Sequence, residues 1–204
     1  MWTNPNDPAK PQGVINKLAR RAVIRGLVLA GMLATGAAHV SAEAMWPDMP
    51  PGTVILFRHA LAPGGGDPSG FQPNNCATQR NLSGDGRTQA VRMGEAFRRR
   101  GVEVTAVWSS QWCRTRDTAD LAFPAKRIDQ PLFNSFFNAP EHEPSQTRAA
   151  LDLLGTWKGP GVLVVVTHQV NITALTGVVP DSGEGVVIVL NGRNVKVLGR
   201  ITPS

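Results

Sequence analysis

Two histidines of this sequence each follow an apolar run that is typical of a buried strand. Arg58 and His59 come directly after the run 53–57, and His168 comes directly after the run 161–167. Arg114 lies in a polar segment that begins with Ser109 and Ser110, after a third apolar run. Two guanidinium groups beside two imidazoles would bind a tetrahedral oxyanion, because arginine offers paired donors that match phosphate oxygens. The histidines are far apart in the sequence, so only the fold could assemble them.

Predicted strands alternate with predicted helices along the chain. The strands are expected at 53–57, 104–108 and 161–167, the helices at 83–100, 112–123, 144–157 and 169–177, and a hairpin at 184–201. Residues 124–143 are expected to be irregular. This alternation predicts an α/β fold, a three-layer α/β/α sandwich with a mainly parallel central sheet covered on both faces. Ligands of such sheets bind at the carboxyl ends of the strands, where Arg58, His59 and His168 are expected.

Four short motifs, in order, resemble those of the histidine phosphatase superfamily, also called the phosphoglycerate mutase-like family. They are Phe57-Arg58-His59-Ala60, the segment 80–86, the segment 109–119 with its Ser-Ser pair and Arg114, and Thr167-His168. Each motif alone is a weak signal, but four in order are specific. The likeness extends from Thr53 to about Leu198 and most resembles exported bacterial phosphatases, of which the lipopolysaccharide core heptose phosphatases are one type.

The resemblance implies a metal-independent phosphomonoesterase without a cofactor. In this family His59 would attack phosphorus through a neutral ring nitrogen and form a phosphohistidine. Arg58, Arg114 and His168 would bind the phosphoryl oxygens and stabilise their charge during transfer. The four histidines and two cysteines of the chain show no zinc-ligand spacing, which agrees with a reaction that needs no metal.

The proton donor for the leaving oxygen departs from the family pattern. Many members have Glu two places after the first histidine, where this chain has Leu61, and the phytase-like branch has Asp where this chain has Gln169. Glu184, at the start of a predicted strand, is the expected general acid, and the alternative is that it is a solvated turn residue. Three other carboxylates lie in predicted loops: Asp67, Glu141 and Glu143.

Three more residues are candidates for contact with the substrate. Arg80 could reach a phosphate from its loop, although an arginine before a helix is more commonly a surface residue. Gln169 and Asn171 follow His168 and could orient it or touch the substrate at a helix N-terminus, which attracts anions.

The two cysteines are expected to form a disulfide. Cys76 lies in the loop after the first predicted strand and Cys113 directly precedes Arg114, so both should border the same pocket. An even count in an exported protein permits a bridge, and two separate buried thiols are the alternative.

The N-terminal segment has the pattern of a secretory signal peptide. Within residues 1–42, five basic residues and one acidic residue precede the uncharged apolar run 26–38, and small residues follow it around Ala42 and Ala44. A run of this length covers roughly 20 Å, which is too short to span a bilayer core of about 30 Å. We therefore expect a signal peptide over 1–42, of the twin-arginine type at Arg20-Arg21, and one domain over 43–204. An uncleaved anchor or a buried helix is the alternative.

The charge distribution and the export signal limit the partners. The net charge of +6 resides mostly in the N-terminal segment, so nucleic acid is not expected as a partner, and no stable membrane span remains after signal removal. A periplasmic or secreted location predicts a phosphorylated small molecule or an envelope phosphoester as substrate. The alternatives are a phosphoglycerate mutase, a phosphohistidine-protein phosphatase, and a non-catalytic anion-binding module of the same fold.

Overall fold

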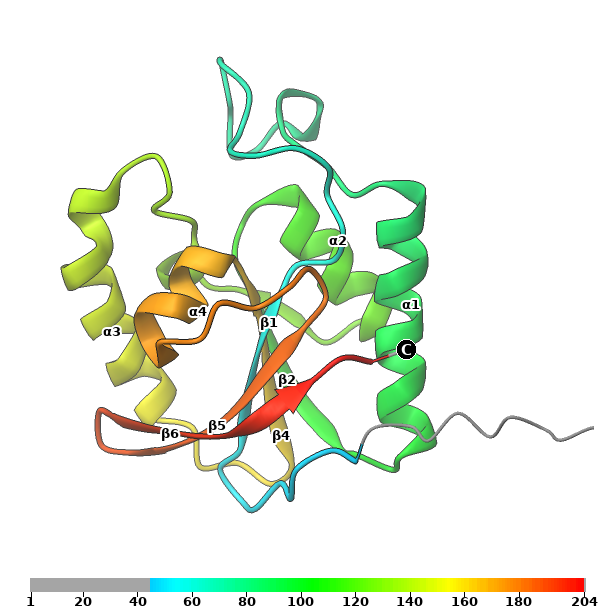
Figure 1. The fold of residues 1–204 in the computed structure, drawn as a ribbon, viewed down its shortest axis with the longest axis vertical. Helices are drawn as coiled ribbons and strands as arrows, with labels where there is room; N and C mark the ends of the chain where they lie inside the picture. Colours follow the sequence, from blue (N-terminus) through cyan, green and yellow to red (C-terminus); the bar gives the residue numbers. More distant parts are fainter. Residues whose placement is uncertain (1–44, 204) are drawn as a thin grey trace, which may run out of the picture. The chain divides into compact units, whose positions relative to one another are not determined.

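A six-stranded sheet with the strand order β3-β2-β4-β1-β5-β6 forms the centre of the computed structural model, which describes residues 45–203 (Figure 1). The strands are β1 (Val54–Arg58), β2 (Val104–Ser109), β3 (Arg127–Asp129), β4 (Val162–Thr167), β5 (Gly185–Asn191) and β6 (Asn194–Ile201). Strands β1 to β4 are parallel, whereas β5 is antiparallel to β1 and β6 is antiparallel to β5. The expected signal peptide, 1–42, lies outside the described residues.

Helices cover both faces of this sheet. They are α1 (Gly84–Arg99), α2 (Cys113–Ala122), α3 (Glu143–Gly155) and α4 (Gln169–Thr176), with short 3-10 turns η1 (Cys76–Thr78), η2 (Pro131–Phe133) and η3 (Pro140–His142). One buried cluster joins the sheet to α1 and α2, and a second joins its other face to α3 and α4. The predicted three-layer α/β/α sandwich with a mainly parallel sheet is therefore confirmed.

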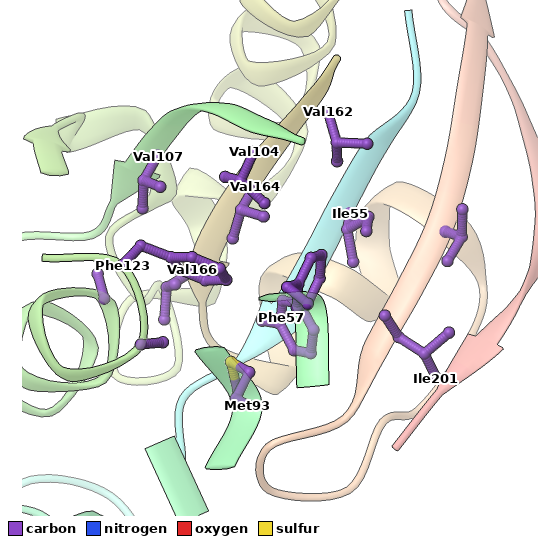
Figure 2. Packing of buried hydrophobic residues seen from close by; sticks show 14 residues of the cluster. Ile55, Phe57, Met93, Val104, Val107, Phe123, Val162, Val164, Val166 and Ile201 are labelled. Atoms are coloured by element: carbon purple, nitrogen blue, oxygen red, sulfur yellow. The ribbon is translucent and has the colours of Figure 1, made fainter. Parts of the chain in front are cut away.

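The alternation of side chains along β1 separates the two clusters. Ile55 and Phe57 pack in the first cluster with Met93 of α1, as Figure 2 shows, whereas Val54 and Leu56 pack in the second. These four apolar side chains of β1 are fully buried, and the burial of each one stabilises the fold by roughly 1.5–3 kcal/mol. Because both faces of β1 are covered, the position of the residue that follows it is tightly determined.

Close packing of α1 fixes the chain just beyond β1. Ser83 caps the helix by accepting a hydrogen bond from the Gly86 backbone N–H at 3.0 Å. A Cβ atom at Gly86 would lie 2.0 Å from the Leu61 carbonyl oxygen, so only glycine allows this approach. The first turn of α1 therefore packs directly on the backbone two residues after His59.

The segment 124–143 differs from the sequence expectation, which was an irregular structure. It contains β3, an edge strand of three residues that pairs with β2, as well as the turns η2 and η3. The β3 sequence is Arg-Ile-Asp, and its Ile128 side chain is 54% exposed. A strand this short and polar has no apolar run to mark it, and its pairing with β2 determines its conformation.

Candidate active site

The carboxyl ends of β1, β2 and β4 bring the predicted chemistry to one edge of the sheet. Arg58 ends β1, His59 follows it, and His168 follows β4 as the residue before α4. The His59 backbone N–H donates to the Thr167 carbonyl at 3.0 Å, which ties the two strand ends together. Arg114, the second residue of α2, completes the group. These four side chains line one cavity of about 160 Å³.

His59 is held as a neutral ring with a lone pair on Nε2. Its Nδ1 lies 2.8 Å from the Ala60 carbonyl, which can only accept, so Nδ1 carries the hydrogen. Arg114 Nε donates to His59 Nε2 at 3.2 Å, which requires that Nε2 is unprotonated. Burial, with the charge of Arg114, lowers the pKa of His59 to about 3. At neutral pH the ring therefore presents an unprotonated nitrogen to the cavity.

His168 is also buried and neutral, and its ring is oriented by two neighbours. Arg114 Nη2 lies 3.4 Å from His168 Nδ1, and arginine can only donate, so Nδ1 accepts and Nε2 carries the hydrogen. Nε2 lies 2.9 Å from Ser110 Oγ, which in turn donates to Asn134 Oδ1 at 3.2 Å. Burial, with the charge of Arg114, holds the pKa of His168 well below its usual range.

Arg114 is the centre of the site, and it pairs with a carboxylate from the loop after β1. Its Nη1 donates to Asp67 Oδ1 at 2.6 Å and its Nη2 donates to Asp67 Oδ2 at 3.2 Å. The Trp112 indole N–H donates to the same Oδ2 at 2.9 Å. The Arg114 and Asp67 side chains are only 3% and 6% exposed. Removal of either partner of a buried pair leaves an uncompensated buried charge, which costs about 3–5 kcal/mol.

The two remaining arginines of the cavity have different roles. Arg58 donates from Nη1 to the Pro180 carbonyl at 3.0 Å, while its buried Nε has no hydrogen-bond partner among residues 45–203. Arg80 lines the cavity, but it donates to the carbonyls of Ala62, Gly64 and Gly66. Arg80 therefore holds the glycine-rich loop in shape, whereas Arg58 keeps a donor for an anion.

Glu184 is not brought to the cavity, and the expectation that it faces the substrate is wrong. Its carboxylate oxygens accept from Arg200 Nε at 2.5 Å and Nη2 at 2.6 Å, and from the Asp181 backbone N–H at 2.8 Å. The cause is the register of the β5–β6 hairpin, which sets Arg200 opposite Val186. The hydrogen bond from Arg200 lowers the pKa of Glu184 despite its burial. A carboxylate held in this way is ionised and turned toward β6.

The two residues of α4 that were expected to contact the substrate lie in different surroundings. Gln169 lines the cavity beside His168. Asn171 donates from Nδ2 to the Asn134 carbonyl at 2.9 Å and is not among the residues that line this cavity. Asn171 therefore supports the segment that orients Ser110 and lies outside the anion pocket.

The expected disulfide is present and lies next to the site. Cys76 of η1 is joined to Cys113, the first residue of α2, with a Cα–Cα distance of 5.7 Å. The Gln79 side chain accepts a hydrogen bond from the Cys113 backbone N–H at 2.9 Å, so the loop after β1 is attached to α2 twice. In Figure 1 this loop, between β1 and α1, rises above the edge of the sheet where the strands end.

Charge and loop together define what the cavity can bind. Three guanidiniums and one carboxylate line it, a net of two positive charges around two neutral imidazoles. This balance matches a phosphate dianion.

Among the described residues, no cluster of three or more histidine, cysteine or acidic side chains could hold a metal ion. No helix within 45–203 is long and apolar enough to cross a membrane.

Sequence comparison identifies the segment that contains the first three motifs. Residues 54–132 match the sequence model of the histidine phosphatase superfamily (branch 1), a stretch from β1 into η2 that includes His59 and Arg114. The stretch from β1 into η2 is therefore similar in sequence to the histidine phosphatase superfamily, and His168 lies beyond the matched stretch. No curated protein matches the chain.

Solved structures share the fold at low sequence identity. The protein histidine phosphatase SixA in complex with tungstate aligns over 74% of this chain and 97% of its own, with 16% identity and a TM-score of 0.50. The protein of the open reading frame Rv3214 from Mycobacterium tuberculosis aligns over 71% and 94%, with 17% identity and a TM-score of 0.52. TTHB049 from Thermus thermophilus aligns over 74% and 99%, with 17% identity and a TM-score of 0.52. At these identities the likeness concerns the fold, which is phosphoglycerate mutase-like.

Proposed function

We propose that this protein is an exported phosphomonoesterase that acts through a phosphohistidine on His59. The observation that carries the proposal is the unprotonated Nε2 of His59, which faces the Arg114 guanidinium at 3.2 Å inside an anion-sized cavity. A nucleophile beside the cation that binds its target needs no further activation at neutral pH. The match of residues 54–132 to the histidine phosphatase superfamily supports the same reaction.

The reaction has two steps, and both use groups of the cavity. First, the lone pair of His59 Nε2 forms a bond to phosphorus, and the ester P–O bond breaks with its electron pair on the leaving oxygen. Second, water attacks phosphorus, the N–P bond breaks, and its pair returns to Nε2 as phosphate leaves. Arg58 and Arg114 stabilise the phosphoryl charge in both steps, so the guanidiniums supply what a metal ion supplies in other phosphatases. His168, whose Nδ1 accepts from Arg114 and whose Nε2–H faces Ser110, holds the Arg114 guanidinium in place.

The substrate is proposed to be a small phosphate ester or the phosphorylated end of a larger envelope molecule, such as a phosphorylated heptose of the lipopolysaccharide core. A cavity of about 160 Å³ is smaller than pockets that enclose drug-sized ligands, which begin near 300 Å³. The phosphoryl group therefore occupies most of the cavity, and the rest of the substrate extends past Ser135 and Phe137 at its lining.

Export is proposed on the pattern of residues 1–42, and the disulfide agrees with it because such bridges persist in oxidising compartments. Cell fractionation followed by N-terminal sequencing tests this proposal, with a periplasmic or secreted product beginning after Ala42 or Ala44 expected. Unchanged export in a host that lacks the twin-arginine translocase would exclude that route.

Hydrolysis of p-nitrophenyl phosphate in EDTA tests the activity itself. The parent protein and His142→Ala, a variant of an exposed histidine on η3, are expected to be active. His59→Ala is expected to be inactive, and acid quenching of the parent during turnover with labelled substrate should not preserve the adduct, whereas alkaline quenching should. Activity that is lost in EDTA or kept in His59→Ala would refute the proposal. No turnover by the parent together with phosphate binding would instead favour the non-catalytic anion-binding module.

A further inference from the structure

A phosphomonoesterase of this kind needs a proton for the leaving oxygen, and the cavity contains a single carboxylic acid. Among the described residues that line it, Asp67 is the one acidic side chain. Glu184, the acid expected from the sequence, is bound to Arg200 outside the cavity. The source of the proton must therefore be sought in the loop that follows β1.

The Arg114 guanidinium lies between the nucleophile and this acid. Its Nε faces His59 Nε2 at 3.2 Å, while its two terminal nitrogens face the Asp67 carboxylate at 2.6 and 3.2 Å. A phosphoryl group bound to the same guanidinium would lie near both His59 and Asp67. In-line displacement requires the nucleophile and the leaving oxygen to lie on opposite sides of phosphorus.

We propose that Asp67 is the general acid of this site, and that it exchanges its contact with Arg114 for a proton when a phosphoryl group binds. The inference rests on the proposed phosphatase function. Asp67 neutralises the buried Arg114 guanidinium in this structure, and the phosphoryl oxygens of a bound substrate would take over that role. The carboxylate is then left next to a dianion, and like charges in close contact favour the protonated form of one of them.

The causes of the lowered pKa of Asp67 agree with the proposed exchange of the Arg114 contact for a proton. Burial by itself raises the pKa of Asp67, but hydrogen bonds from Arg114 and Trp112 outweigh that effect and hold the pKa below its ordinary value. Removal of the Arg114 contact leaves burial as the larger influence. The Asp67 carboxyl is therefore ionised while it pairs with Arg114, and it binds a proton once a phosphoryl group has replaced that contact.

Trp112 keeps the carboxylate in place after the exchange. Its indole N–H donates to Asp67 Oδ2 at 2.9 Å, and its ring stacks on Phe71 with a centroid distance of 4.9 Å. Oδ1, the oxygen that lacks the indole contact, is free to carry the proton once Arg114 turns to the phosphoryl group. Trp112 is thus a positioning residue for the acid.

The proton is balanced over the two steps. The acid takes its proton from solvent or from a substrate that binds as the monoanion, since the second pKa of a phosphate ester is about 6. Protonated Asp67 gives its proton to the leaving oxygen as the P–O bond breaks, which yields the alcohol. Ionised Asp67 then accepts a proton from the water that attacks the phosphohistidine, and this restores the acid.

The test compares two esters that differ in leaving group. p-Nitrophenolate leaves without much help, whereas the alkoxide of β-glycerophosphate must be protonated. Asp67→Asn is expected to lower kcat for β-glycerophosphate by about 10²–10⁴-fold, while kcat for p-nitrophenyl phosphate falls less than about tenfold. Asp152→Asn is the matched control, because Asp152 forms a similar two-contact pair with Arg193 on the surface. It is expected to leave both rates unchanged.

Binding of inorganic phosphate shows whether the Asp67→Asn variant is folded. Because the substitution frees Arg114, the affinity of Asp67→Asn for phosphate is expected to rise above that of the parent. Equal losses on the two esters, or no loss on either, would overturn the role of Asp67 while the proposed function stands. Activity of the parent that does not depend on His59 would overturn the proposed function instead.

The pH dependence of the unmodified protein gives an independent test that does not depend on the folding of a variant. If Asp67 donates the proton, kcat for β-glycerophosphate falls at high pH, because Asp67 in the complex then loses its proton. Over the same pH range, kcat for p-nitrophenyl phosphate stays constant. The same alkaline limb for both esters would overturn the proposal. Trp112→Phe, which removes the indole hydrogen bond to Asp67 and keeps an aromatic ring beside Phe71, is expected to move this limb to higher pH.

Discussion

Acidification should destabilise this protein through its two active-site histidines. His59 and His168 are 2% and 3% exposed, and both have pKa values far below the ordinary 6.5. Between the ordinary pKa and the folded-state pKa of about 3, the unfolded chain binds a proton at His59 that the folded chain does not. The stability due to the neutral ring is thus complete above pH 6.5 and is lost as the pH falls.

The magnitude follows from this difference in proton binding. Between pH 7 and pH 5, His59 alone should lower the free energy of unfolding by about 1.9 kcal/mol, and the lowered pKa of His168 acts in the same direction. Asp67 and Glu184 also have lowered pKa values, but their contribution is lost mainly below pH 4.5, the ordinary pKa of glutamate. The range from pH 7 to pH 5 therefore reports chiefly on the histidines.

Urea unfolding of the parent and of His59→Ala at both pH values isolates the effect. The variant lacks one of the two groups, so the difference in unfolding free energy between parent and variant should fall by about 1.9 kcal/mol from pH 7 to pH 5. Val166→Ala, which makes a cavity in the core without changing a titrating group, should show a constant difference. A difference for His59→Ala that is independent of pH would refute the neutral, buried state of this ring.

Three further predictions concern the loop after β1 and the residues packed near it. Replacement of both Cys76 and Cys113 by Ser should lower the free energy of unfolding by about 3–4 kcal/mol, as judged by urea unfolding, because the bridge closes a long loop; a loss below about 1 kcal/mol would contradict this. Glu184→Gln should keep the activity on β-glycerophosphate, since its carboxylate lies outside the cavity; a loss confined to that ester would restore Glu184 as the acid. Gly86→Ala should destabilise by about 1–3 kcal/mol in thermal unfolding, because its Cβ meets the Leu61 carbonyl at 2.0 Å; an unchanged Tm would show that the backbone yields freely.

Much of the fold could be predicted because its signals are local. The apolar runs at β1 and β4 predict strands buried on both faces, and the structure buries them so. The alternation with helices, the glycine turn of the β5–β6 hairpin and the position of Arg58, His59 and His168 after strand ends follow from the same patterns. The edge strand β3 was missed because a strand of three residues with a single apolar side chain carries no periodic signal.

The choice of the acid could not be made from the sequence, because it depends on long-range geometry. Glu184 stands at the start of a strand, as predicted, but the register of the hairpin pairs it with Arg200. Asp67 lies 47 residues from Arg114 in a loop whose glycines permit several paths, and no pattern of neighbours marks its side chain as buried.

Residue types and order alone therefore determined the fold class, the anion chemistry and the pair of histidines. Those properties depend on apolar periodicity and on the functional groups themselves, which are present in the chain before it folds. The tertiary structure decided the protonated nitrogen of each ring, the carboxylate that reaches the cavity, and the one that does not. These depend on contacts within about 3 Å between segments far apart in sequence, which only the packed fold specifies.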